Sequence, residues 1–125
     1  MQQKSKNVRI MNIENAKSQM RKGMLEYCIL LLLSERAAYA SDIIQKLKEA
    51  DLLVVEGTLY PLLTRLKNDG VLAYEWQEST QGPPRKYYKL TDMGHLLLQQ
   101  LDGAWYELEN SVHVLKNMSV QPFHA

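Results

Sequence analysis

The sequence predicts a mainly helical fold with one small β-hairpin, an α+β arrangement in the order α-α-α-β-β-α. Apolar residues recur at three- and four-residue spacing in four separate stretches, which is the period of an amphipathic helix. Between the third and fourth stretches, two segments rich in aromatic and branched residues flank a polar loop, which is typical of a hairpin. The length of 125 residues, with 46% hydrophobic and 23% charged residues, suits one ordinary domain with an appended helix.

Two helices are expected in the first half of the chain, after an N-terminal arm. Residues 1–14 are polar and basic, so we expect a loosely held, flexible arm. A helix is predicted over about 16–34, where the periodic apolar positions are Met20, Met24, Cys28, Leu31 and Leu32. A shorter helix is predicted over about 39–50, with Asp42 in its first turn, where the helix dipole favours an anion.

A third helix is predicted within residues 56–70, which read EGTLYPLLTRLKNDG. Its leucines are spaced i, i+3, i+4 and i+7, which forms an amphipathic stripe of Leu59, Leu62, Leu63 and Leu66. Pro61 is tolerated in a first helical turn, where backbone N–H groups have no intrahelical partner, so the helix is expected to start near Gly57 or Thr58. Gly70 is the expected left-handed stop.

A hairpin and a long last helix complete the predicted fold. Strands are predicted at 71–76 and 85–90, joined by the loop 77–84. Because side chains alternate along a strand, two residues of the second strand are expected to face the core, Tyr88 and Leu90. The alternate set is expected to point away from it, namely Arg85, Tyr87 and Lys89. The last helix is predicted over 91–118, capped by its first two residues.

Three helices followed by a two-stranded hairpin is the order of a winged helix-turn-helix, in which the loop 77–84 would be the wing. A two-stranded sheet is not stable alone, so the hairpin is expected to pack on the third helix. We therefore expect a winged helix-turn-helix DNA-binding domain at 15–90, a dimerisation helix at 91–118 and a tail at 119–125.

The face of the third helix opposite the leucines is hydrogen-bonding and mildly basic, with no acidic residue before Asp69. Such a helix suits the major groove, where Arg, Asn and Thr reach base edges and Tyr donates to phosphate. A solvated helix face is the alternative for the helix alone, and the two cations of the hairpin favour DNA. The candidate DNA-contacting residues are Thr58, Tyr60, Pro61, Thr64, Arg65, Lys67, Asn68, Arg85 and Lys86.

The last helix carries a heptad stripe with 4-3-4-3-4-3 spacing, which is typical of a helix that pairs with another helix. The residues of this stripe are Leu97, Leu101, Ala104, Leu108, Ser111, Leu115 and Met118. Too little chain remains to cover this apolar surface, so we expect pairing with the same helix, or with the first helix, of a second copy. Folding back onto its own three-helix unit is the alternative. The candidate dimer-interface residues are Met20, Met24, Leu97, Leu101, Ala104, Trp105, Leu108, Val112 and Leu115.

The charge distribution is uneven although the net charge is only +1. Residues 1–25 hold six basic side chains and one acidic side chain, whereas residues 91–125 hold one basic and four acidic side chains. A basic N-terminal segment and an acidic C-terminal segment suit a protein that binds an anionic polymer with one of its faces. Charged side chains that are merely solvated are the alternative.

Several other classes of protein are disfavoured. The longest apolar run, 28–33, is too short to span a bilayer, and no signal peptide is visible, so we expect a cytoplasmic protein without a membrane partner. Cys28 is the single cysteine and lies in an apolar stretch, so we expect a buried thiol. The three histidines are scattered, and no spacing suits catalysis, a metal or another cofactor, so we expect no enzyme.

Four motifs in order resemble those of the PadR-type transcriptional regulators. They are Leu-Tyr-Pro-x-Leu at 59–63, a glycine exit at 69–71, Gly-x-x-Arg-Lys-Tyr-Tyr at 82–88 and Leu-Thr-x-x-Gly at 90–94. The resemblance covers about residues 18–118 and is specific because the series is complete. One departure is Tyr-Ala-Ser at 39–41, where the family often has Tyr-Gly-Tyr. The single last helix resembles the compact subgroup with one C-terminal dimerisation helix.

The resemblance implies a homodimeric repressor that binds a palindromic operator in double-stranded DNA. It also implies that some relatives sense small aromatic or amphipathic compounds at the dimer interface. Trp105 matches the position of an interface tryptophan in drug-sensing members, so it is the candidate ligand-binding residue; plain interface packing is the alternative. The competing function is a winged-helix module that binds protein without sequence-specific DNA binding.

Overall fold

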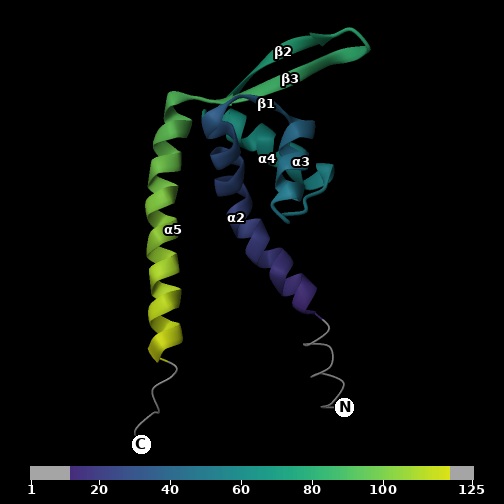
Figure 1. Ribbon diagram of the computed structural model, residues 1–125. Coiled ribbons are helices and arrows are strands. Elements are labelled where there is room, and N and C mark those ends of the chain that lie inside the picture. Colours follow the sequence, from purple (N-terminus) through teal and green to yellow (C-terminus); the bar gives the residue numbers. More distant parts are fainter. Residues whose placement is uncertain (1–11, 119–125) are drawn as a thin grey trace, which may run out of the picture.

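The computed structural model describes residues 12–118 as four helices and a three-stranded sheet (Figure 1). The elements are α2 (Ile13–Glu35), β1 (Ala38–Tyr39), α3 (Ala40–Glu49), α4 (Glu56–Asn68), β2 (Leu72–Ser79), β3 (Gly82–Leu90) and α5 (Asp92–Met118). The predicted order of helices, hairpin and long last helix is confirmed, with β1 as an addition. Within the described residues, none of the helices offers an apolar run of the length that a bilayer requires.

The first helix starts earlier than predicted. α2 begins at Ile13, so the last two residues of the expected arm are helical. The N–H of Ala16 donates to the carbonyl of Asn12 at 3.0 Å, and Glu14 lies in the first turn, where the helix dipole favours a carboxylate. The rest of the predicted arm, 1–11, and the predicted tail, 119–125, lie outside the described residues.

The core lies where α2, α3 and α4 meet under the sheet. The fully buried side chains of these elements are Ile29, Leu30, Ile43, Leu47, Leu59, Leu63, Leu66 and Leu72. Three of the four predicted α4 leucines are fully buried, and Leu62 packs against the core from its edge. Tyr88 and Leu90 of β3 are also buried, as their position on one strand face predicted.

Gly70 ends α4 as predicted. Its φ is +81°, the left-handed region that glycine adopts without a steric penalty. The N–H of Gly70 donates to Lys67 O, and the N–H of Val71 donates to Leu66 O, both at 3.0 Å. This pair of bonds is a Schellman motif, and it turns the chain directly into β2.

The sheet is antiparallel with the order β1-β3-β2, so β3 lies between the other two strands. β1 has no counterpart among the predicted elements, because two residues are too few to show an alternating pattern. It pairs through Ala38 with Tyr88 and through Tyr39 with Tyr87. This pairing holds the start of α3 against the hairpin.

The predicted wing loop 77–84 is wrong. The strands continue until Ser79 pairs with Gly82, which leaves only Thr80 and Gln81 in the turn. Prolines are tolerated at 83–84 because β1 covers only the base of β3, so this part of its outer edge needs no ladder donor, and the register is irregular beside it. The wing is therefore a long two-stranded ribbon that projects beyond the helices (Figure 1).

α5 packs beside α2 along part of its length, and the two helices then diverge (Figure 1). Thr91 caps α5, since its Oγ1 accepts the N–H of Gly94 at 3.0 Å. Leu98 is buried, and the hydroxyl of Tyr27 donates to Asp102 at 2.5 Å. Every residue from 103 to 118 is exposed in the single chain.

Candidate nucleic-acid interface

The outer face of α4 is open to solvent opposite its buried leucines. Tyr60 is 46% exposed, and three other predicted contact residues on this helix, Thr64, Lys67 and Asn68, are also exposed. The leucine stripe fixes this orientation, because it faces the core. A helix with such a face meets the geometric requirement for entering a major groove.

Aromatic rings hold the cations of the hairpin beside this helix. The Nζ of Lys86 lies 4.6 Å from the ring centroid of Tyr74 and 5.5 Å from that of Trp76. The Nζ of Lys67 on α4 lies 5.8 Å from the same Tyr74 ring. Contacts of this kind contribute roughly 0.5–1 kcal/mol at exposed sites, and they orient an ammonium group without neutralising its charge.

Arg85 takes a different position, because consecutive residues of β3 point to opposite faces of the sheet. Its guanidinium lies 3.9 Å from the ring centroid of Tyr39, and that ring in turn contacts Tyr87 with centroids 4.8 Å apart. The cation is thereby placed next to the start of α3, where backbone N–H groups favour an anion.

Two adjoining clefts separate the hairpin from α4. The first, of about 330 Å³, is lined by Tyr60 and Thr64 of α4, Trp76 and Lys86 of the hairpin, and Ser41 of α3, among others. The second, of about 170 Å³, shares Thr64 and Lys86 and adds Lys67 and Asn68. Six of the nine predicted DNA-contacting residues border these clefts: Tyr60, Thr64, Lys67, Asn68, Arg85 and Lys86.

Three predicted contact residues lie elsewhere. Pro61 is exposed on α4 but lines neither cleft, and Thr58 is half-buried in the first turn and faces a different pocket. Arg65 is exposed, with guanidinium nitrogens 3.3 Å from a carboxylate oxygen of Glu26 and 3.5 Å from one of Asp69. These two carboxylates offset part of the positive charge that Arg65 presents at this surface.

Sequence reasoning missed several residues of the clefts, among them Trp76 and Ser41. Trp76 is 61% exposed and faces Lys86 across the ladder. Its alternation with Leu72 and Tyr74 could have placed it on this face, because residues two apart on a strand share a side. Ser41 could not be found in this way, since it reaches the cleft only because β1 pairs with β3.

Ionisation adds little to this surface. Burial raises the pKa of the Tyr88 hydroxyl, with neighbouring Tyr74 and Tyr60 as lesser causes, so Tyr88 is neutral at physiological pH. The charge of the surface therefore comes from its lysines and Arg85. Among residues 12–118 no group of histidine, cysteine and acidic side chains is arranged to hold a metal ion.

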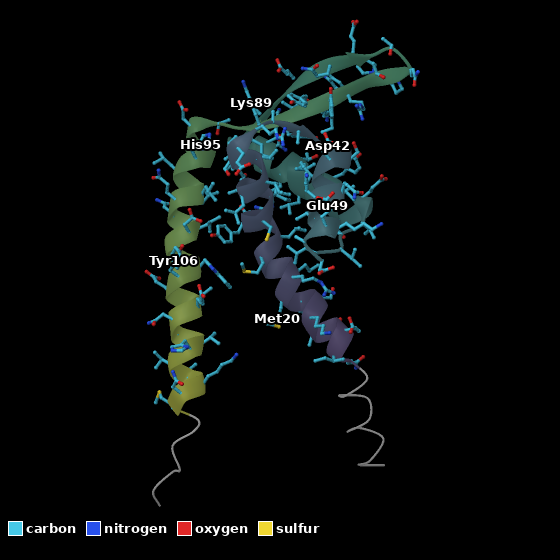
Figure 2. All side chains as sticks on the ribbon, viewed as in Figure 1. Met20, Asp42, Glu49, Lys89, His95 and Tyr106 are labelled. Atoms are coloured by element: carbon cyan, nitrogen blue, oxygen red, sulfur yellow. The ribbon has the colours of Figure 1, made fainter. Side chains whose placement is uncertain are left out.

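The predicted dimer residues divide into two sets. Leu97 and Leu101 are half-buried and pack against the core of their own chain, and Met24 is half-buried. The others remain exposed: Met20 (74%), Ala104, Trp105 (38%), Leu108 (59%), Val112 (49%) and Leu115 (62%). Met20 projects from α2 on the side that faces α5 (Figure 2).

Comparison with known proteins identifies the family. The chain matches the PadR-like family of transcriptional regulators over residues 29–100, more than half of its length. A PadR-like transcription factor from Bacteroides fragilis shares 71% sequence identity, with a TM-score of 0.70, over 81% of this chain and 98% of that chain. The chain belongs to the PadR-like family.

Other relatives of this PadR-like protein agree in fold. A PadR family regulator from Eggerthella lenta is 34% identical with a TM-score of 0.72, over 82% of this chain and 87% of that one. A PadR-like regulator from Bacillus cereus is 36% identical with a TM-score of 0.69, over 78% and 95%. The protein is thus a DNA-binding transcriptional regulator with a winged helix-turn-helix, and it is not an enzyme.

Proposed function

We propose that this PadR-like protein is a homodimeric cytoplasmic repressor that binds a palindromic operator. α4 enters the major groove, and the hairpin lies on the backbone or in the minor groove. The observation that carries this proposal is the paired cleft, in which Thr64 of the helix and Lys86 of the hairpin border one continuous surface. A two-fold pair of such surfaces suits half-sites about one helical turn apart.

Selection of bound fragments from the source genome, at two controlled salt concentrations, tests sequence-specific binding. We expect enrichment of a palindrome and an affinity that falls as salt rises, because neutralised phosphates release counterions. Recovery of fragments without a common sequence would favour the competing function, a protein-binding module. A reporter gene placed behind the enriched site distinguishes a repressor from an activator, and we expect higher expression when the regulator is deleted.

Two kinds of variant separate base contacts from phosphate contacts. Thr64→Ala and Asn68→Ala should each cost about 1–3 kcal/mol on the specific site and little on random DNA, if these side chains read bases. Arg85→Ala and Lys86→Ala should weaken binding to all sequences and lower the salt slope by about one each. A double variant of Arg85 and Lys86 that binds like the wild type would remove the hairpin from the interface.

We also propose that a flat aromatic or amphipathic compound binds beside Trp105 between two copies and releases DNA. The supporting observation is that Trp105 is 38% exposed near the middle of α5, beside other exposed apolar residues. A stacked ring gains roughly 0.5–1.5 kcal/mol beyond its area burial. Titration with aromatic cations should change tryptophan fluorescence in the Trp76→Phe variant and not in Trp105→Phe. Unchanged fluorescence and operator affinity would make Trp105 an interface residue only.

A further inference from the structure

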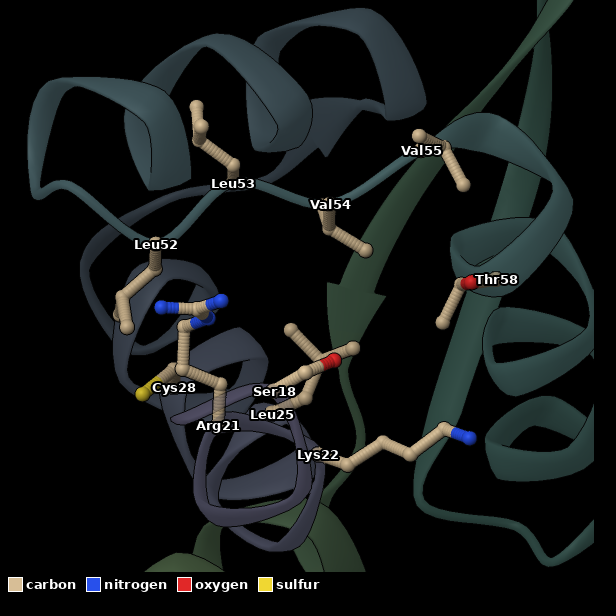
Figure 3. Close-up of a pocket in the computed structure, with 10 residues that line it drawn as sticks. All are labelled: Ser18, Arg21, Lys22, Leu25, Cys28, Leu52, Leu53, Val54, Val55 and Thr58. Atoms are coloured by element: carbon tan, nitrogen blue, oxygen red, sulfur yellow. The ribbon is translucent and has the colours of Figure 1, made fainter. Parts of the chain in front are cut away.

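A separate pocket of about 220 Å³ lies between the N-terminal half of α2, the segment 52–55 and the first turn of α4 (Figure 3). It shares no residue with the two clefts at the hairpin. Leu25 and Cys28 contribute from α2, and Leu52 and Val54 contribute from the connecting segment. Each of these four side chains is buried or half-buried, so the pocket has an apolar lining continuous with the core.

Two cationic side chains, Arg21 and Lys22, line this apolar pocket. Arg21 lies beside Leu52, and Lys22 extends toward α4 near Thr58, so the positive groups flank the pocket on two sides (Figure 3). Neither cation has an ion-pair partner within 4 Å among residues 12–118. None of the described residues that line the pocket carries a carboxylate. Within residues 12–118, therefore, no acidic group pairs with this positive charge beside the apolar surface.

The pocket overlaps only partly with the proposed dimer surface, because Cys28 lies one helical turn from Met24 on the same side of α2. At about 100° per residue on a helical wheel, Leu25 and Lys22 point more than a quarter turn away from Met20 and Met24. Met20 instead faces α5 (Figure 2). A second copy that pairs along α5 and the Met20 side of α2 would leave the Leu25 and Lys22 side of this pocket open.

We propose that the pocket binds an aliphatic monocarboxylate, such as a medium-chain fatty acid. The carboxylate would lie between Arg21 and Lys22, and the hydrocarbon chain would lie against Leu25, Leu52 and Val54. A charge-assisted hydrogen bond to a guanidinium or ammonium group is stronger than a neutral one. An aliphatic chain fits better than an aromatic ring, because the lining residues that the structure describes include no aromatic side chain for a ring to stack on.

The single cysteine provides a direct test of occupancy, because Cys28 lines the pocket and is the only thiol in the chain. The rate at which a small neutral thiosulfonate modifies Cys28 is measured in the full-length protein with octanoate, benzoate, octanol or octylammonium. We expect octanoate to slow the reaction most. Affinity should rise about fourfold for each methylene from butanoate to octanoate, as apolar burial predicts.

Charge-reversal variants test the role of the two cations. Arg21→Glu combined with Lys22→Glu should abolish protection by octanoate and give protection by octylammonium. Lys48→Gln is the matched control, since Lys48 is an exposed cation on α3 that does not line the pocket, and octanoate should protect this variant as it does the wild type. Calorimetric titration of octanoate provides a second readout that does not depend on the thiol.

Three results would overturn the proposal. Octanoate that neither slows Cys28 modification nor gives binding heat would show that the pocket takes no such ligand. If octanol protected Cys28 as well as octanoate does, the carboxylate would not be recognised. If benzoate did so, the aliphatic chain would not be recognised. Protection that rises with protein concentration, and not with octanoate, would assign the pocket to a second copy of the chain. None of these readouts requires DNA, so they are independent of the proposed repressor function.

Discussion

Gly94 lies where α5 passes closest to the segment that leaves α4. A Cβ atom built on Gly94 would collide with the backbone carbonyl oxygen of Val71, and Leu90 Cδ2 would lie at 3.3 Å. The same carbonyl accepts the Thr91 N–H at 3.1 Å, so it cannot move away without loss of a hydrogen bond. The glycine of the Leu-Thr-x-x-Gly motif is therefore required by space rather than by a special backbone angle.

Gly94→Ala should lower the free energy of unfolding by about 1–3 kcal/mol, the usual cost of forcing an extra carbon into a filled site. Gly103→Ala is the matched control on the same helix, since nothing lies within 4 Å of a Cβ there. It should raise stability by up to about 1 kcal/mol through helix propensity. Urea denaturation measures both changes, and similar effects of the two substitutions would contradict this account of Gly94.

Tyr27 joins α2 to α5 through a hydrogen bond that depends on its proton. The hydrogen bond to Asp102, together with burial and the charge of Asp102, raises the pKa of Tyr27 to about 12 from its ordinary value of 10.0. Because the folded-state pKa is above the unfolded value, the stabilisation is fully present below pH 10 and is lost as the pH rises toward 12.

Tyr27→Phe should therefore lower the free energy of unfolding by about 1 kcal/mol at neutral pH, the usual contribution of one hydrogen bond. The difference from the wild type should shrink as the pH rises from 10 toward 12. Tyr60→Phe is a suitable control, because Tyr60 is 46% exposed, forms no hydrogen bond through its hydroxyl within the described residues and does not contribute to the pKa of Tyr27. A difference between wild type and Tyr27→Phe that is constant across this pH range would exclude the proton-dependent contact.

At the scale of elements, local periodicity predicted the helices better than the hairpin. The stripe that includes Leu59 and Leu63 fixes both the type of α4 and its buried face within one short segment. The position of the hairpin turn depends on the register between the two strands. The two prolines, considered only with their neighbours in sequence, indicate a loop instead. Prolines at 83–84 can remain in a strand because β1 does not cover this part of β3 and because the register with β2 is irregular beside them, and the sequence displays neither feature.

The same distinction applies to the candidate site. Thr64 and Asn68 could be predicted because they lie opposite the leucines on one helix. The ion pair between Arg65 and Glu26 joins residues 39 positions apart, so no local spacing indicates it. The contact of Arg85 with Tyr39 likewise depends on the unpredicted strand β1.

Lys86 and Lys89 provide a matched pair that tests the hairpin as an element. Both lie on β3, but Lys86 borders the clefts beside α4, whereas Lys89 is exposed on the opposite face of the sheet (Figure 2). Lys86→Ala should lower operator affinity about tenfold or more at low salt, and Lys89→Ala should leave it nearly unchanged. Gel-shift titration at two salt concentrations measures both, and equal losses would indicate long-range charge attraction rather than a defined contact.

At the scale of the whole molecule, the single chain leaves apolar side chains of α5 and α2 exposed to solvent. Leu108, Val112 and Leu115 are each about half exposed or more on α5, and Met20 is exposed on the side of α2 that faces this helix. Contiguous apolar surface of this kind is uncommon in stable monomers and marks interaction sites. Leu108 and Leu115 belong to the heptad stripe that the sequence predicts, whereas the half-burial of Leu97 and Leu101 in their own chain depends on how α5 packs beside α2.

We expect a homodimer at micromolar concentration, and the exposure pattern shows which substitutions dissociate it without unfolding the chain. Leu108→Asp and Leu115→Asp change side chains that are 59% and 62% exposed in one protomer, so the isolated fold tolerates them. Each should raise the dimer dissociation constant by at least about thirtyfold, as loss of an interface hot spot does. Sedimentation velocity measures the monomer fraction, and circular dichroism reports whether the monomer stays helical.

Val114→Asp is the matched control for this prediction. Val114 is also an exposed apolar residue of α5, at 45%, but it lies about a quarter of a turn from the centre of the heptad stripe on a helical wheel. It should leave the dimer intact, because a charge there stays in water. A wild-type monomer, or equal dissociation by all three substitutions, would mean that the stripe is not the surface on which two copies meet. The proposed spacing of two operator half-sites would then need another origin, since it depends on α5 joining the two recognition helices as one rigid pair.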